Sequence, residues 1–222
     1  MLRILLLIIL LFYTCVFGSL LDKANNEFKN KNIKIALDLY EQSAKDGEDK
    51  ALFILGKIYY NGKYVKRDIS KAMEYFRKAA LYGNIKAKYN VAIIYGQKSY
   101  KKHSYKKSYD IFLELAREHH AKAQNKVGMY LLYGLGVERD YKLAVKWFEQ
   151  SYFVNEYQSS ACNLAVMFAN GYGVFANFGR ARVLAQKGYE NKNPICVKVY
   201  KQFNLHKYKR DKGFKFGFYG DL

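Results

Sequence analysis

A helix-capping residue followed four positions later by a small residue recurs along the chain at a nearly constant interval. The pairs are Asn32/Ala36, Asp68/Ala72, Ser104/Ser108, Asp140/Ala144 and Asn177/Ala181, in steps of 36, 36, 36 and 37 residues. The first side chain of each pair can accept hydrogen bonds from the free amides at a helix start. A fixed period of this size is typical of stacked helical hairpins. We therefore predict an all-α fold built as a repeat array of about five hairpins.

Each period contains two amphipathic segments, which we call the A helix and the B helix. We expect A helices over 49–61, 85–96, 121–133 and 157–170, and B helices over 68–82, 104–118, 140–153 and 177–190. A short polar helix from Ser19 and a B-type helix from Asn32 precede them, and an A-type helix capped by Asn193 follows. A column of small A-helix residues faces a column of large B-helix residues, which predicts tight packing within each hairpin. The small column is Gly56, Ala92, Gly128 and Ala165, and the facing column is Tyr40, Phe76, Phe112, Phe148 and Ala185.

Two stretches of the chain resemble the Sel-one-like repeat, a relative of the tetratricopeptide repeat. They run from Gly128 to Phe148, through a Gly-x-Gly-Val turn, and from Asn163 to Val174. The resemblance is specific in 49–83, 121–155 and 158–191, whereas 85–118 departs from it. In that repeat Lys98, Ser99, Tyr100 and Lys101 replace the Gly-x-Gly-Val turn. The resemblance implies a right-handed α-solenoid that serves as an adaptor for other proteins, with the A helices lining its concave side.

One stripe of A-helix residues is expected to face away from the core and to bind a protein or peptide partner. Helical-wheel counting places it three, six and ten positions after the leading small residue. The stripe consists of Lys57, Asn61, Asn90, Ile93, Gln97, Lys126, Met129, Tyr133, Asn163, Val166 and Asn170. Asparagine and lysine side chains suit an extended backbone and acidic side chains. We expect the protein to be a monomer. Replacing Asn90, Lys126 and Asn163 together is expected to leave its thermal stability nearly unchanged.

The first 18 residues have the pattern of a secretory signal peptide. Arg3 precedes an apolar run, and Val16-Phe17-Gly18 supplies a cleavage site before Ser19. Cleavage there predicts a periplasmic or secreted protein, with the repeat array over 19–203 and a basic aromatic tail over 204–222. The alternative is a retained membrane anchor, because 4–21 carries no charge over 18 residues.

Two cysteines remain after such cleavage, Cys162 and Cys196. An even number in an exported chain permits one disulfide. Both residues fall near equivalent points of successive A helices, and such points lie about 8–10 Å apart. Because a disulfide requires Cα atoms roughly 4.4–6.8 Å apart, the sequence leaves this bond open.

The sequence contains two matches to the S-x-x-K nucleophile motif, Ser99/Lys102 and Ser104/Lys107. They raise the alternative of a β-lactam-binding or β-lactam-hydrolysing enzyme, but the S-D-N and K-T-G elements of that class are missing from the sequence. Adjacent His119 and His120 point in divergent directions, and no recognised zinc-ligand spacing occurs. We therefore expect a non-enzymatic protein without a metal or cofactor.

Positive charge dominates the chain, with a net charge of +19. It is concentrated in the segment Lys98–Lys107 and in the tail, where Lys207, Lys209, Arg210, Lys212 and Lys215 precede or alternate with Phe214, Phe216 and Phe218. Such segments suit an anionic membrane or a cell-envelope polyanion, and nucleic acid ranks below these for an exported chain. The alternative is a basic loop, and a tail that covers the last hairpin.

Overall fold

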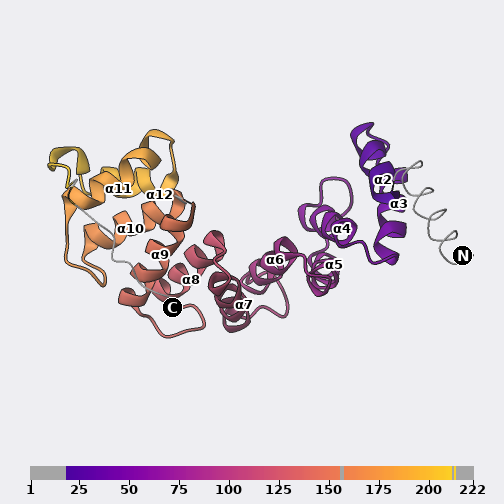
Figure 1. Ribbon diagram of the computed structural model, residues 1–222, viewed down its shortest axis with the longest axis horizontal. Coiled ribbons are helices and arrows are strands. Elements are labelled where there is room, and N and C mark those ends of the chain that lie inside the picture. Colours follow the sequence, from indigo (N-terminus) through magenta and orange to yellow (C-terminus); the bar gives the residue numbers. More distant parts are fainter. Residues whose placement is uncertain (1–18, 156–157, 212, 214–222) are drawn as a thin grey trace, which may run out of the picture. The chain divides into compact units, whose positions relative to one another are not determined.

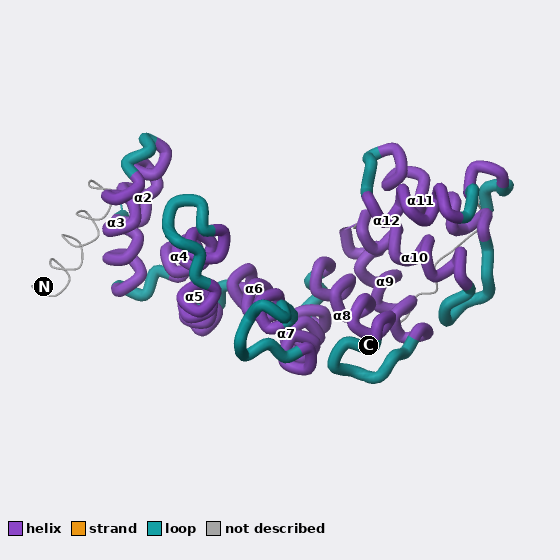
Figure 2. The backbone as a smooth tube through the Cα atoms, turned by 180° about the vertical axis from the view of Figure 1, so that it is seen from behind, coloured by secondary structure: helices purple, strands orange, loops and turns teal. Residues whose placement is uncertain are grey.

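The computed structural model describes residues 19–155, 158–211 and Gly213 (Figure 1). Within these residues the regular structure consists of eleven α-helices and one short 3-10 helix, and no strand is drawn among them (Figure 2). The helices are α2 (Leu20–Lys29), α3 (Ile33–Lys45), α4 (Asp49–Asn61), α5 (Ile69–Leu81), α6 (Ile85–Tyr95), α7 (Tyr105–Arg117), α8 (Ala121–Tyr133), α9 (Tyr141–Asn155), α10 (Gln158–Asn170), α11 (Phe178–Glu190), α12 (Pro194–Gln202) and η1 (Leu205–Lys207). The predicted all-α repeat fold is confirmed, and each expected helix lies within a few residues of its predicted range.

The capping residues explain where the B helices begin. Asp68, Ser104 and Asn177 each accept a hydrogen bond from the amide three residues later, over 2.8–3.2 Å. Asp140 does the same with the amide of Leu143. Asn32 does not, because its side-chain amide donates instead to Glu27 at 2.6 Å. Four of the five predicted caps are thus confirmed, and the one at Asn32 is wrong.

The small residue four positions after each cap is buried without exception. Ala36, Ala72, Ser108, Ala144 and Ala181 are all 0 % exposed. The glycines of the A helices are equally constrained. A Cβ atom on Gly56 would lie 2.6 Å from the Phe76 ring, and one on Gly128 would lie 2.6 Å from the Phe148 ring. These contacts show why a small residue must face a large one in these two hairpins.

The described residues form two compact units, each with its own core. Unit 1 extends to Ile94 and includes Ser99–Lys101, and unit 2 contains Tyr95–Lys98 and the chain from Lys102 onward. In unit 1, Leu21, Ala24, Tyr40, Leu55 and Ile58 pack together. Unit 2 buries, among others, Phe112, Val127, Phe148, Leu164 and Met167. The division falls in the segment where Lys98–Lys101 replace the Gly-x-Gly-Val turn.

The predicted signal peptide, residues 1–18, lies outside the described residues, as do Lys212, Phe214 and the residues after it. None of the described helices has the length and apolar character needed to cross a membrane. The described start of the tail is not separate from the repeats. Leu205 is 0 % exposed, and Arg182 of α11 donates hydrogen bonds to the carbonyls of His206 and Tyr208 at 2.9 and 2.6 Å.

Candidate functional site

Most of the predicted binding stripe reaches the surface. Lys57, Asn61, Tyr133 and Asn170 are exposed, and Asn90, Ile93, Gln97, Lys126, Met129 and Val166 are partly exposed. Asn170 and Asn90 use their side-chain amides to donate to carbonyls one turn back in their own helices, Val166 and Lys86. The side-chain oxygens of these two residues are the atoms that remain for a partner's amide groups. Binding by the stripe stays a prediction.

Asn163 corrects the prediction, because its side chain is only 5 % exposed. It donates to the side-chain oxygen of Asn125 at 2.8 Å, across the junction between α10 and α8. Helical-wheel counting treats each A helix alone and so overlooks the neighbouring A helix, which covers one flank of the stripe. We therefore expect that replacing Asn163 lowers stability, contrary to the expectation for the triple replacement.

A buried polar network holds α8, α9 and α10 together beside this residue. Ser151 of α9 donates to the carbonyl of Ala121 at 2.7 Å. The hydroxyl of Ser160 lies 2.7 Å from that of Ser151 and 3.0 Å from the side-chain oxygen of Asn125. Ser151 and Ser160 are 0 % exposed and Asn125 is 5 % exposed. Because satisfied buried networks restrict how helices pack, α8 and α10 are held in a defined register.

The exposed side of α8 and α10 in unit 2 is the part of the stripe whose helices are held in place by this buried network. We call Lys126, Met129, Tyr133, Val166 and Asn170 the α8–α10 face. Spacings of three and four residues place each set on one side of its helix. Tyr133 is 57 % exposed, while Lys126 and Met129 are partly buried. The face therefore combines apolar contact area with a cation.

Lys126 is the electrostatic centre of this face. Burial lowers the pKa of its amine, and no carboxylate pairs with it among the described residues. The two helices that form the face contribute no acid, since α8 carries Lys122 and Lys126 and α10 carries no charged residue, and the acid of the intervening α9, Glu149, is only 4 % exposed. A partly desolvated amine in these surroundings favours a carboxylate supplied by a binding partner.

The same charge bias extends through the A helices. Together α4, α6, α8, α10 and α12 carry eight lysines and a single acid, Asp49. The B helices α3, α5, α7, α9 and α11 carry seven acids. The B helices also carry thirteen lysines and arginines, so their net charge of +6 is close to the +7 of the A helices. The A helices therefore differ by their scarcity of acids, not by a larger excess of positive charge.

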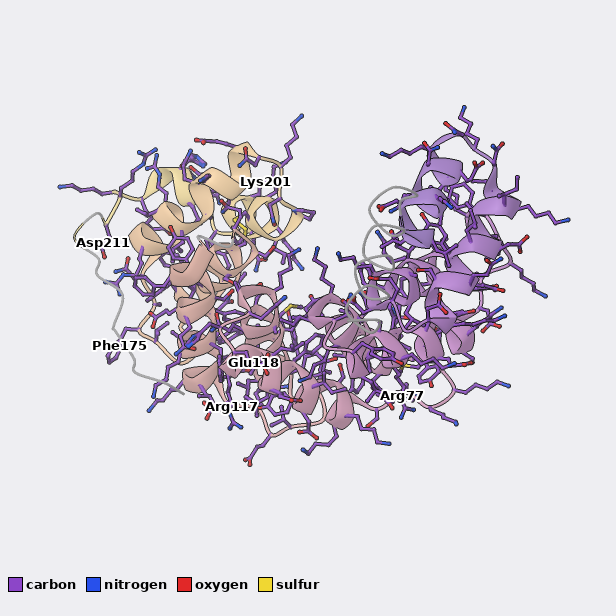
Figure 3. The ribbon with its side chains drawn as sticks, turned by 45° about the vertical axis from the view of Figure 1, so that its right-hand side comes forward. Arg77, Arg117, Glu118, Phe175, Lys201 and Asp211 are labelled. Carbon is purple, nitrogen blue, oxygen red and sulfur yellow. A yellow bond between two sulfur atoms is a disulfide. The ribbon has the colours of Figure 1, made fainter. Side chains whose placement is uncertain are left out.

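Cys162 of α10 and Cys196 of α12 form a disulfide in the structure, drawn in yellow in Figure 3. Their Cα atoms are 4.8 Å apart, closer than expected for equivalent points of two A helices. The premise of equivalence was wrong, because the separation of 34 residues is shorter than the repeat. Gly188 of α11 makes room for the bond, since a Cβ atom there would lie 2.8 Å from the sulfur of Cys162 and still closer to that of Cys196.

The disulfide occupies the same place in the repeat as the polar network one hairpin earlier. Adding 37 residues to Asn125 and Ser151 gives Cys162 and Gly188, and adding 36 to Ser160 gives Cys196. One junction is therefore held by hydrogen bonds and the next by a covalent bond. Aligning the repeats by their period would have revealed this correspondence, which inspection of the cysteines alone does not.

Four of the residues considered for catalysis and metal binding, Ser104, Lys107, His119 and His120, have structural roles. Ser104 caps α7, and the amine of Lys107 lies over the Tyr95 ring, 5.7 Å from its centre. His119 follows α7 in a left-handed conformation (φ 59°), at the place in the repeat where Gly47 and Gly83 end α3 and α5. His120 caps α8, accepting from the amide of Ala123 through Nδ1, and burial lowers the pKa of its imidazole.

The hairpin geometry and the A-helix surface define an α-helical repeat protein of the α-solenoid class. Comparison with protein families matches the Sel1 repeat over residues 28–48, 49–84, 121–152 and 158–193, so the chain belongs to the Sel1 repeat family. The match passes over 85–120, which contains the divergent turn. Sel1 repeats generally act as scaffolds for protein–protein interactions. A comparison with curated proteins finds no match.

Solved structures share the fold. One is c5321, a protective antigen of uropathogenic Escherichia coli with an SLR fold. It is 24 % identical with a TM-score of 0.69, and the match covers 78 % of this chain and 37 % of that one. This chain thus spans little more than a third of the length of c5321. A Sel1 repeat protein from Oxalobacter formigenes is 19 % identical with a TM-score of 0.66, and the match covers 85 % of this chain and 86 % of that one.

Proposed function

We propose that this protein is an exported, non-enzymatic scaffold that binds an acidic segment of another protein through the exposed sides of its A helices. The observation that carries the proposal is Lys126, a partly buried amine that no carboxylate of the described residues pairs with, beside Met129 and Tyr133 on the α8–α10 face. An acidic side chain of the partner placed there accepts a charge-assisted hydrogen bond from the amine of Lys126. Met129, Tyr133 and Val166 supply the apolar contact that gives such a complex its affinity.

Two features support export. The sequence of residues 1–18 has the pattern of a signal peptide. The fully buried disulfide between Cys162 and Cys196 is of the kind that persists in the periplasm or outside the cell and is rare in a reducing cytosol. Intact-mass analysis of the protein purified from its host tests this part. A mass corresponding to a chain that begins at Ser19 and lacks two hydrogens is expected, whereas an uncleaved or fully reduced chain contradicts it.

Binding is tested with a short Glu-rich peptide and its Gln-rich counterpart, measured by fluorescence anisotropy at two salt concentrations. The Glu peptide should bind more tightly, and Lys126→Ser should weaken its binding by roughly tenfold, the loss of one charged hydrogen bond. Lys142→Ser is the matched control, because Lys142 is an exposed lysine on α9 of the same unit and outside the face. Equal weakening by both substitutions would show only attraction to net charge, and equal binding of the two peptides would refute an acidic partner.

A further inference from the structure

The turn between α10 and α11 exposes a phenylalanine that the other turns lack. Phe175 is 97 % exposed. The equivalent positions, counted by the repeat period, are Lys66, Lys102 and Glu138. Water disfavours an exposed aromatic ring, and the charged residues at the other three positions show that the repeat itself does not require one. We therefore infer that Phe175 has a role other than stabilising the fold.

The turn that carries Phe175 is firmly held. The backbone amide of Tyr172 donates to the carbonyl of Met167 at 3.0 Å. The backbone amide of Asn177 donates to the carbonyl of Phe168 at 2.9 Å. The Tyr172 ring stacks on Tyr141, with centroids 4.8 Å apart and planes at 9°. The backbone at Gly173 touches the start of α9, leaving no room for a side chain. The phenylalanine is thus presented on a fixed support.

A basic segment is fixed beside this turn. Arg182 holds the carbonyls of His206 and Tyr208, and the Tyr208 ring stacks on Phe178 at 4.6 Å. Asn177, two residues after Phe175, donates to the carboxylate of Asp211 at 3.0 Å. Figure 3 accordingly shows Phe175 and Asp211 on the same side of unit 2.

The charges of this region are almost all positive. The side chains of Lys207, Lys209 and Arg210 are exposed. The carboxylate of Asp211 is engaged by Asn177 and lies 3.6 Å from the guanidinium of Arg180. The segment next to Phe175 therefore presents cations without a free counter-charge of its own.

We propose that Phe175 and the segment His206–Arg210 form a docking surface for an anionic lipid bilayer. The Phe175 ring enters the boundary between headgroups and acyl chains, while Lys207, Lys209 and Arg210 contact lipid phosphates. A bilayer accepts a protruding ring at any point and offers phosphates to long flexible side chains, so it needs no matching pocket. A protein partner would have to provide a cavity for an isolated ring. This surface shares no residue with the α8–α10 face and does not depend on the proposed partner binding.

The test is co-sedimentation of the full chain with vesicles of phosphatidylcholine alone and of phosphatidylcholine with phosphatidylglycerol. Binding is expected only to the anionic vesicles and should weaken as salt rises. Phe175→Ala should lower the affinity about tenfold. Replacing Lys207, Lys209 and Arg210 with serine should lower it roughly fivefold for each charge.

Two matched controls remove an exposed apolar side chain or three exposed positive charges from parts of the chain outside the proposed surface. Leu81→Ala removes a side chain that is 86 % exposed in unit 1. Replacing Lys98, Lys101 and Lys102 with serine removes three exposed charges from the other basic segment. Both controls should bind like the unmodified protein.

Phe175→Trp provides a second readout that does not depend on affinity. Its fluorescence should shift to the blue on anionic vesicles, against the constant signal of Trp147, which is 2 % exposed. The proposal is overturned if this shift is missing, if Phe175→Ala binds normally, or if a control variant loses as much affinity. Equal binding to soluble polyphosphate, with the same loss in Phe175→Ala, would also overturn it, because it would replace the bilayer by a soluble anion.

Discussion

Removal of the disulfide should destabilise unit 2 by a predictable amount. The bond closes a loop over a sequence separation of 34 residues. The loop entropy that it removes from the unfolded chain corresponds to about 4 kcal/mol at 25 °C. Replacing Cys162 and Cys196 with serine should lower the free energy of unfolding by about this amount. Urea unfolding followed by Trp147 fluorescence measures it, because this residue is buried in α9 of unit 2.

The correspondence with the polar network sharpens this prediction. The substitutions Cys162→Asn, Gly188→Ser and Cys196→Ser together copy the network of Asn125, Ser151 and Ser160. Because a net hydrogen bond contributes about 1 kcal/mol, the triple variant should recover roughly 1–2 kcal/mol relative to the double serine variant.

Gly188→Ser alone should have the opposite effect. In the disulfide-bonded protein its Cβ atom would overlap the sulfur of Cys196, and overpacking of this kind costs about 1–3 kcal/mol. The structural equivalence of the two junctions would be refuted if Gly188→Ser changed the free energy of unfolding equally in the disulfide-bonded protein and in the variant that lacks the disulfide. A loss below about 1 kcal/mol on removing the disulfide would refute the entropy argument.

Three further predictions concern packing, protonation and capping. Gly128→Ala should destabilise the protein by about 1–3 kcal/mol, measured by urea unfolding, because the new methyl group would overlap the Phe148 ring. Burial raises the pKa of Glu149 to about 7, although the positive charge of Arg180 opposes the shift. Glu149 therefore contributes most stability below pH 4.5, and about 3 kcal/mol of it is lost as pH rises through 7. Glu149→Gln should remove that part of the pH dependence in unfolding measured from pH 4.5 to 8, and an unchanged profile would contradict the assignment. Asp68→Ala should cost about 1 kcal/mol and Asn32→Ala less, as thermal unfolding would show, because only Asp68 accepts a hydrogen bond from its helix.

The repeat period predicted the fold well because it encodes contacts that are local in sequence. Each cap and each small residue acts within its own hairpin, so Asp68, Ala72 and the pair of Gly56 and Phe76 can be placed without three-dimensional information. The helix ends follow from the same residues. The divergent turn at Lys98–Lys101 was also visible in the sequence, and it is where the two compact units divide.

Contacts between successive repeats were harder to predict. Asn163 was assigned to the surface because counting on one helix does not show that Asn125 of the preceding A helix covers it. The Cys162–Cys196 bond was left open for the same reason, since it depends on which flanks of α10 and α12 face each other. Packing of the tail on α11 through Arg182 likewise joins residues far apart in sequence. The periodicity within a single helix does not reveal such contacts, and only an alignment of whole repeats relates the disulfide to the polar network one hairpin earlier.

Partner binding through the A helices is tested most directly by photo-crosslinking in cells at two matched positions. A photoreactive amino acid replaces either Tyr133, 57 % exposed on the α8–α10 face, or Phe153, 53 % exposed on α9. We expect a discrete crosslinked partner with an acidic contact segment at Tyr133, with the yield reduced by Lys126→Ser and no such product at Phe153. The same product at Phe153, or a yield at Tyr133 unaffected by Lys126→Ser, would contradict binding through the A helices.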